Sequence, residues 1–70
     1  MNKTITYRAW GVDFVGDSES LEALDAAKLY AEHGVTQGWG DTCSVFLVAG
    51  GGHQLCPVEI TTYTREGATQ

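Results

Sequence analysis

The fold is decided by residues 42–64, which read TCSVFLVAGGGHQLCPVEITTYT. Runs rich in β-branched and apolar residues predict strands at Thr42–Ala49 and Gln54–Thr64. The segment Gly50–His53, with three consecutive glycines, predicts a hairpin loop of about four residues between the two strands. These residues therefore predict an antiparallel hairpin as the centre of the fold.

The register of this hairpin follows from its apolar residues. If Ala49 pairs with Gln54, Val45 lies opposite Val58. The residues that then share one face of the hairpin are all apolar: Cys43, Val45, Leu47, Cys56, Val58 and Ile60. Because a slip of one residue would put this apolar set out of phase, we expect the face to be buried against a helix.

The other face of the hairpin carries Phe46, Val48 and Leu55, and Trp10 from the N-terminal strand extends it. With only one helix to cover the sheet, this face is expected to stay open. Exposed apolar patches of this kind mark interaction sites. These four residues are therefore candidate contacts with a partner.

The N-terminal half predicts one strand followed by one helix. Alternating residues predict a strand over residues 3–15, with a bend at Gly11. The helix is expected from about Leu21 to His33, with Gly34 just past its end. Residues spaced at helical intervals predict the buried face of the helix: Leu21, Leu24, Ala27 and Ala31.

Together these elements predict a single α+β domain over residues 1–70. It is a two-layer sandwich of a three-stranded sheet and one helix, in the order β-α-β-β. Order is expected over about residues 3–64, with residues 65–70 frayed. Pro57 favours an edge position or a bulge for the last strand. Two strand orders remain open: 1-2-3 with the first two strands parallel, and an order with the last strand in the middle.

The charge of the chain limits its partners. Nine acidic residues against four basic ones give a formal net charge of −5, and the basic residues form no stripe. A nucleic-acid binder needs cations to displace phosphate counterions, so we expect no direct nucleic-acid partner. The N-terminus has no apolar signal segment, and the longest apolar run is too short to span a membrane. We therefore expect a cytoplasmic protein with no membrane partner.

The residues that could support catalysis or bind a metal do not form a recognisable site. Cys43 and Cys56 lie four residues out of register, about 13 Å along the strands, which is too far for a disulfide. The spacing of the cysteines and of His33 and His53 fits no zinc motif. His53 and Cys56 are three residues apart in a strand and would therefore point to opposite faces, so they cannot act together as a base and a nucleophile. The sequence therefore predicts a non-enzymatic protein with two buried thiols, no metal and no cofactor.

Two further features are candidate partner contacts. Trp39 stands between two glycines and either covers the edge of the core or acts as a contact anchor. The acidic face predicted for the helix is a candidate recognition surface for lysine or arginine of a partner. The candidate residues of that face are Glu22, Asp25, Leu29 and Glu32.

Residues 17–24, which read DSESLEAL, follow the predicted strand and open an alanine-rich helix that ends at Gly34 and precedes the hairpin. In this pattern, in size and in acidity, the chain resembles small orphan proteins encoded by phages and mobile elements, among them some anti-CRISPR proteins. The resemblance covers Lys3–Thr64 and includes no specific motif. It implies a stoichiometric inhibitor that docks on a host protein complex in the host cytosol.

Two other functions remain open at this point. The first is a sponge for a small ligand or nucleotide signal, formed in a homo-oligomer, with Trp10, Phe46 or Trp39 stacking on a base. The second is a structural subunit whose open sheet face forms a homodimer. The leading interpretation is a non-enzymatic protein-binding module whose partner is a host protein or complex, or a second copy of the chain.

Overall fold

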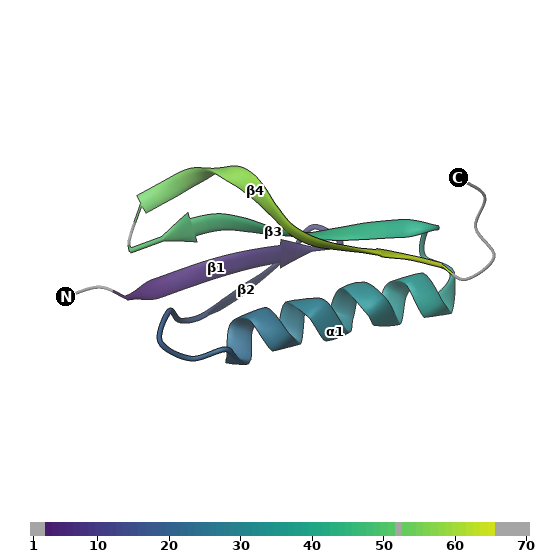
Figure 1. The fold of residues 1–70 in the computed structure, drawn as a ribbon, viewed down its shortest axis with the longest axis horizontal. Helices are drawn as coiled ribbons and strands as arrows, with labels where there is room; N and C mark the ends of the chain where they lie inside the picture. Colours follow the sequence, from purple (N-terminus) through teal and green to yellow (C-terminus); the bar gives the residue numbers. More distant parts are fainter. Residues whose placement is uncertain (1–2, 52, 66–70) are drawn as a thin grey trace.

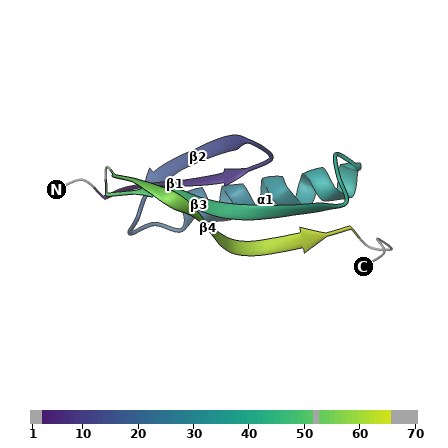
Figure 2. The ribbon, with the colours of Figure 1, turned by 90° about the horizontal axis from the view of Figure 1, so that it is seen from above.

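The computed structural model describes residues 3–51 and 53–65, without the side chains of residues 54 and 55. The elements follow in the order β1 (Thr4–Ala9), β2 (Val12–Asp17), α1 (Glu22–Gln37), β3 (Thr42–Gly50) and β4 (His53–Thr64). The four strands form one sheet in the order β2-β1-β3-β4, and every neighbouring pair is antiparallel. The helix lies along one face of the sheet (Figure 1). Seen from above, β1 and β3 lie in the middle of the sheet, with β2 and β4 at its edges (Figure 2).

The α+β class and the two-layer arrangement are confirmed, but the prediction of three strands is wrong. The segment expected as one bent strand folds back on itself, because Trp10 and Gly11 form a two-residue turn in which Ala9 pairs with Val12. Both turn residues have positive φ angles, 54° and 73°, as a type I′ hairpin turn requires. The first strand lies next to β3, as in the predicted order 1-2-3, but antiparallel to it, so the predicted parallel crossover is wrong. The alternative order with the last strand in the middle is also wrong, because β4 lies at the edge of the sheet.

The left-handed backbone of Trp10 is unusual because a side chain in this conformation costs about 1–2 kcal/mol. The indole compensates by packing on the helix side of the sheet, where its Nε1 donates a hydrogen bond to the carbonyl oxygen of Ala31 at 3.2 Å. No Asn-Gly or Asp-Gly pair marks the turn in the sequence. A tertiary contact therefore stabilises a turn that local sequence preference does not predict.

The register of the β3–β4 hairpin is confirmed only next to its turn. Ala49 pairs with Gln54 as predicted, but Leu47 pairs with Val58 and Val45 pairs with Thr61. The predicted pair of Val45 and Val58 is therefore wrong.

Two irregularities in the hairpin shift its register. Residues 55–57 of β4 lie opposite the single residue Val48, and Ile60 is an extra residue further along β4. Pro57 falls within the first irregularity, where its missing N–H leaves no ladder hydrogen bond unmade. The strand that contains Pro57 is both an edge strand and a bulged one. The connection also shortens to residues 51–52, because Gly50 pairs with His53.

The core between the helix and the sheet is built from small side chains. Its buried residues are Ala9, Ala27, Ala31, Val35, Cys43 and Val45. The layers approach so closely that a Cβ added to Gly16 would lie 2.7 Å from the Cβ of Ala23. Of the residues predicted for the buried face of the helix, Ala27 and Ala31 are buried and Leu24 packs against the core, but Leu21 does not belong to this face. Ala23 is buried, whereas Leu21 precedes the helix and is 66% exposed.

The helix is longer than predicted because Gly34 lies inside it. The missing side chain of Gly34 makes room for two indoles, since a Cβ there would lie 2.3 Å from Trp10 and 2.4 Å from Trp39. The helix ends at Gly38, whose φ is 85°. The N–H of Trp39 donates to the carbonyl of Gly34 at 2.9 Å, and the N–H of Gly38 donates to that of Val35 at 3.3 Å, which is a Schellman motif.

The two cysteines and the end of β4 differ from expectation. Both thiols are free, but only Cys43 is buried, and Cys56 is exposed, so the prediction of two buried thiols is wrong. Arg65 is held in place, because its N–H donates to the carbonyl of Asp41 at 2.7 Å and its guanidinium pairs with the Asp41 carboxylate at 2.9 Å. The rest of the segment predicted to be frayed, residues 66–70, lies outside the described residues.

Candidate functional site

The sheet face away from the helix is mainly polar. Ser44 Oγ donates to Glu59 Oε1 at 3.2 Å and lies 2.8 Å from the hydroxyl of Thr62. Arg8 donates to the two carboxylate oxygens of Asp13 at 2.6 and 3.3 Å. Phe46 is on this face as predicted, but it is half-buried and has Arg8 and Glu59 as its cross-strand neighbours.

Two of the other residues predicted for this face, Val48 and Trp10, do not extend Phe46 into an exposed apolar patch. Val48 lies at the register shift of β3 and is only 4% exposed. Trp10 packs on the helix side, against Ala31 and Gly34. Leu55 belongs to β4, and its side chain lies outside the described part of the chain. The burial of Val48 and the β1–β2 turn, which carries Trp10 to the helix side, therefore remove two of the predicted contacts from the open face.

The Arg8–Asp13 pair makes a testable contribution to stability. The hydrogen bond from Arg8, followed by its charge, lowers the pKa of Asp13 below its ordinary value of 3.8. Because the pKa of Asp13 is lower in the folded than in the unfolded state, the pair contributes its full stabilisation at pH values above 3.8. This stabilisation is lost as the pH falls through the folded-state pKa of Asp13. We expect Asp13→Asn to lower the free energy of unfolding slightly at neutral pH, because the pair is exposed.

Urea unfolding of the two proteins at a series of pH values measures this contribution. The difference between them should vanish at pH values well below 3.8. It should also shrink in high salt at neutral pH, because salt screens exposed charges. A difference that is independent of both pH and salt would contradict this role of the pair.

An aromatic row lies on the other side of the sheet, along the flank of α1 nearest β2. Successive ring centroids are 5.4 Å apart for Phe14 and Tyr30, 5.2 Å for Tyr30 and Trp39, and 5.7 Å for Trp39 and Trp10. His33 stands against Trp39 at 5.5 Å. Trp39 is 49% exposed, so it both covers the core edge and presents a surface.

Sequence reasoning missed two members of this row, Phe14 and Tyr30. They come from β2 and from the middle of α1, and they meet only because the β1–β2 turn brings β2 over the helix. The only signal in the sequence was that both residues are aromatic, because aromatic side chains contribute strongly to cores and interfaces. That signal does not show which of them lie together.

The outer edge of β2 lies beside this row. The carbonyl of Lys3, just before β1, accepts from the N–H of Ser18 next to β2, and the carbonyl of Thr4 accepts from the N–H of Gly51 next to β3. The backbone N–H and carbonyl groups of successive residues point to alternate sides of a strand. The register therefore places the backbone N–H and carbonyl groups of Asp13, Val15 and Asp17 on the side of β2 away from β1. No strand of the described chain pairs with this side, because β2 ends the sheet.

A hollow of about 480 Å³ opens between this edge and the start of the helix. Phe14 and Gly16 of β2 line one wall, and Ala23 and Ala26 of the helix line the other. Glu22 also lines it, and the backbone N–H of Glu22 donates to Ser20 Oγ at 3.2 Å. The hollow therefore combines an apolar interior with a carboxylate beside a free strand edge.

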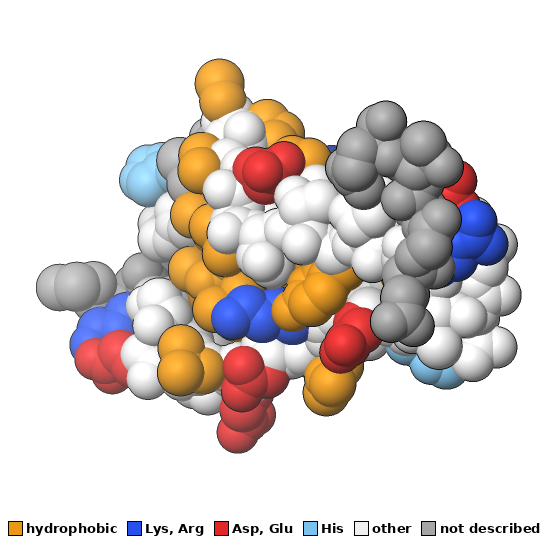
Figure 3. All heavy atoms as spheres, turned by 45° about the vertical axis from the view of Figure 1, so that its right-hand side comes forward, with side chains coloured by type: hydrophobic (Ala, Val, Ile, Leu, Met, Phe, Trp, Pro, Cys, Tyr) orange, Lys and Arg blue, Asp and Glu red, His pale blue; other side chains and the backbone are white. Residues whose placement is uncertain are grey.

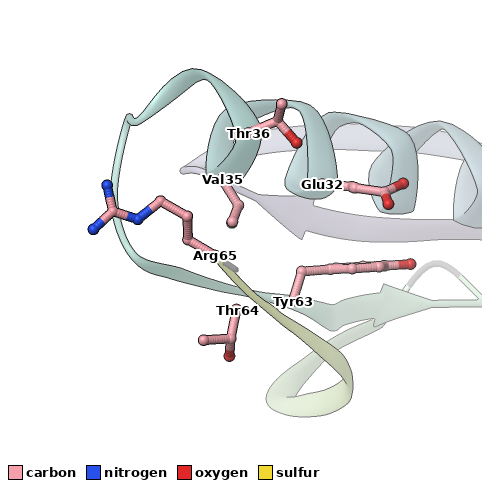
Figure 4. A pocket seen from close by; sticks show the side chains of 6 residues that line it. All are labelled: Glu32, Val35, Thr36, Tyr63, Thr64 and Arg65. Atoms are coloured by element: carbon pink, nitrogen blue, oxygen red, sulfur yellow. The ribbon is translucent and has the colours of Figure 1, made fainter. Parts of the chain in front are cut away.

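A second hollow, of about 400 Å³, lies on the opposite flank of the helix, next to β4. Figure 4 shows Val35 pointing from the helix into this hollow, with Glu32 and the Tyr63 ring on either side. Arg65 turns away from Tyr63 in the same view, and its guanidinium is bound by Asp41. This hollow therefore offers an apolar floor and one carboxylate, without a free cation beside it.

The four residues of the predicted acidic helix face are all exposed, and their spacing along α1 puts them on the side away from the buried alanines. Glu22 lines the hollow next to β2, and Glu32 lines the hollow next to β4. Asp25 and Leu29 are both exposed, and Leu29 is 67% exposed. Figure 3 shows acidic side chains along the lower part of the molecule and a further acidic group higher up, beside the band of hydrophobic side chains. Glu22 and Glu32 therefore border different hollows from the two ends of one exposed stripe of the helix.

The described residues include no group of three or more His, Cys, Asp or Glu that could hold a metal ion. The same part of the chain contains no helix that is long and apolar enough to cross a membrane. Compared with known proteins, the chain matches no family model, no curated protein and no solved structure. The site must therefore be interpreted from its own geometry.

Proposed function

We propose that this chain is a non-enzymatic protein-binding module that contacts its partner through β2. The observation that carries the proposal is the free edge of β2 beside the half-exposed Trp39 and the row that leads to it. Tryptophan and tyrosine dominate the binding energy of many protein interfaces. A free strand edge binds an extended segment through its backbone. The two features together provide hydrogen-bonding groups and an anchor on one flank of the molecule.

The site supports this function better than the two alternatives from the sequence. A nucleotide sponge would need cations near a stacking ring, but Trp39 is surrounded by Trp10, Tyr30 and His33. A homodimer through the open sheet face would bury Arg8, Asp13 and Glu59, which are charged. Burying such groups is unfavourable unless each keeps a partner.

The narrower form of the proposal concerns origin and target. The chain is a phage or mobile-element protein that acts in the host cytosol, and its partner is a host CRISPR–Cas complex that it blocks stoichiometrically. Its small size and net charge of −5 support this form, but the element order that carried the resemblance does not, because β1 and β2 are separate strands. Titration of the protein into a purified CRISPR–Cas cleavage assay tests it, and inhibition complete at equimolar protein is the expected result.

Trp39→Ala tests the broader form. We expect the variant to stay folded, as circular dichroism would show, because Trp39 is half-exposed. Removing such an anchor costs roughly 2 kcal/mol or more of binding energy, so proteins that the wild type retains from host lysate should be lost.

Leu29→Ala is the matched control for Trp39→Ala, because Leu29 is an exposed apolar residue elsewhere on the helix. This variant should retain the same proteins as the wild type. Loss of retention by Leu29→Ala, with Trp39→Ala unaffected, would move the contact to the outer face of the helix and refute the proposed site.

A further inference from the structure

We infer that β2 accepts an extended basic segment of the partner protein as a fifth strand of the sheet. The inference rests on the proposed function and names the chemistry of the partner. It requires free backbone groups at the correct spacing, a place for the side chains of the added strand, and a charge that selects this segment over a second copy of the chain.

The backbone groups come from three residues of β2. Asp13 and Val15 each direct an N–H and a carbonyl away from β1, and Asp17 directs its N–H the same way. The carbonyl of Asp17 is already bound by the N–H of Ser20 at 2.9 Å. Residues 13–17 extend over about 13 Å, so they match a segment of about five residues.

The other edge strand is less suited to this role. The pairing of β4 with β3 is interrupted twice, and β4 contains Pro57. Bulges and proline are devices by which proteins protect an edge from further pairing. In contrast, β2 pairs with β1 over six consecutive residues without a register shift. Its outer edge is therefore a regular template.

The hollow between β2 and the helix would receive side chains of the added strand. Residues of that strand opposite Phe14 and Gly16 would point to the helix side, because directly opposed residues share a face of the sheet. There they would meet the small side chains of Ala23 and Ala26, with Glu22 beside them. A lysine or arginine fits this arrangement, because its aliphatic stem can cover the alanines while its charge meets the carboxylate.

The charge around β2 selects a basic segment. In the described part of the chain, the ion pairs join Lys3 to Glu19, Arg8 to Asp13 and Arg65 to Asp41. None of these pairs neutralises Asp17 or Glu22. A second copy of β2 would bring its own Asp13 and Asp17 against Asp13 and Asp17 of the first copy, on the sheet face away from the helix, and each copy carries a net charge of −5. Like charges across adjacent strands are unfavourable, so self-pairing is disfavoured.

A nine-residue peptide of alternating lysine and valine, with blocked ends, serves as the probe. We expect it to bind at low salt with amide shifts in NMR spectra concentrated on β2 and on the residues of the hollow. The same peptide with glutamate in place of lysine should bind at least tenfold more weakly. Binding should also weaken as salt is added, because the attraction is partly between exposed charges.

Val15→Pro is the decisive variant. The N–H of Val15 points away from β1, so proline removes a group that the free protein does not use and can be accommodated at an edge. We expect the variant to keep its circular dichroism spectrum and to lose at least tenfold in peptide affinity, with Val15→Thr as the control that keeps the N–H. If Val15→Pro unfolds the protein, Glu22→Gln provides the second test, because it should weaken binding of the lysine peptide and reduce its salt dependence.

Three results would overturn the inference. The first is that the lysine and glutamate peptides bind equally well, or that neither peptide binds. The second is a wild-type dimer in analytical ultracentrifugation that Val15→Pro abolishes, which would make a second copy the occupant of the edge. The third is retention of lysate proteins that depends on Trp39 but not on Val15, and in that case the proposed function would stand while the added strand would not.

Discussion

Replacing Val45 by glutamate is expected to leave the chain largely unfolded. Among the described residues, Val45 is the largest side chain that is completely buried, and it lies among the alanines of the helix–sheet core. A carboxylate there would have no partner, and burying an unpaired charge costs several kcal/mol. A domain of this size has a total stability of only about 5 kcal/mol. Circular dichroism and urea unfolding would measure the loss.

Phe46→Glu is the matched control, because Phe46 is the next residue along β3 and faces the other way. Its cross-strand neighbours are Arg8, which attracts the new carboxylate, and Glu59, which repels it. We expect the variant to stay folded, with a change in stability of about 1 kcal/mol. Unfolding of both variants would show that the faces are wrongly assigned.

Phe46→Glu also separates two possible working surfaces. If Phe46 is a partner contact on the open face, as the sequence indicated, this change should weaken association. A contact through β2 and Trp39 predicts that the folded variant retains its partners. Loss of partners by Phe46→Glu would therefore return the contact surface to the open face and contradict the site proposed at β2.

Gly34→Ala is expected to destabilise the protein by about 1–3 kcal/mol. At an ordinary helix position the same change would stabilise by about 1 kcal/mol, because glycine is a poor helix former. Here the new methyl group would lie 2.3 Å from Trp10 and 2.4 Å from Trp39, so one or both rings must move. Urea unfolding gives the change in free energy, and near-ultraviolet circular dichroism reports on the two indoles.

Ala26→Gly serves as a reference for the backbone effect alone, since Ala26 is an exposed residue of the same helix. This variant should lose about 0.5–1 kcal/mol from helix propensity. A gain in stability for Gly34→Ala would mean that the indoles do not pack against the helix backbone, and the aromatic row would lose its foundation.

The sequence alone was sufficient for features that depend on neighbouring residues. Alternation along residues 4–9 and 42–50 and the alanine-rich helix are local patterns, and each produced the expected element. The pairing of Ala49 with Gln54 was also predicted, because a short hairpin connection limits the register beside it. A small α+β domain with one helix could therefore be deduced before any contact was known.

The candidate site could be deduced only in part. Trp39 attracted attention because glycines flank it, and the structure places it on the surface that we propose. The edge of β2 could not be found, because Trp10 and Gly11 do not resemble a hairpin turn and β2 was assigned to the preceding strand. The faces of β4 were misassigned beyond Ile60, since one extra residue there reverses the facing of the residues that follow, so that Thr61 lies opposite Val45 and Tyr63 opposite Cys43.

Composition and local patterning by themselves determined that this chain forms a small acidic domain of strands and one helix. Only the tertiary structure decided that Trp10 turns the chain, that Gly34 lies within the helix and that Phe14, Tyr30 and Trp39 form one row. The physical reason is that these features depend on contacts between distant segments. The indole of Trp10 stabilises an unfavourable backbone only when Ala31 and Gly34 lie beneath it. Such contacts outweigh local preferences of about 1 kcal/mol, and they do not exist until the chain has folded.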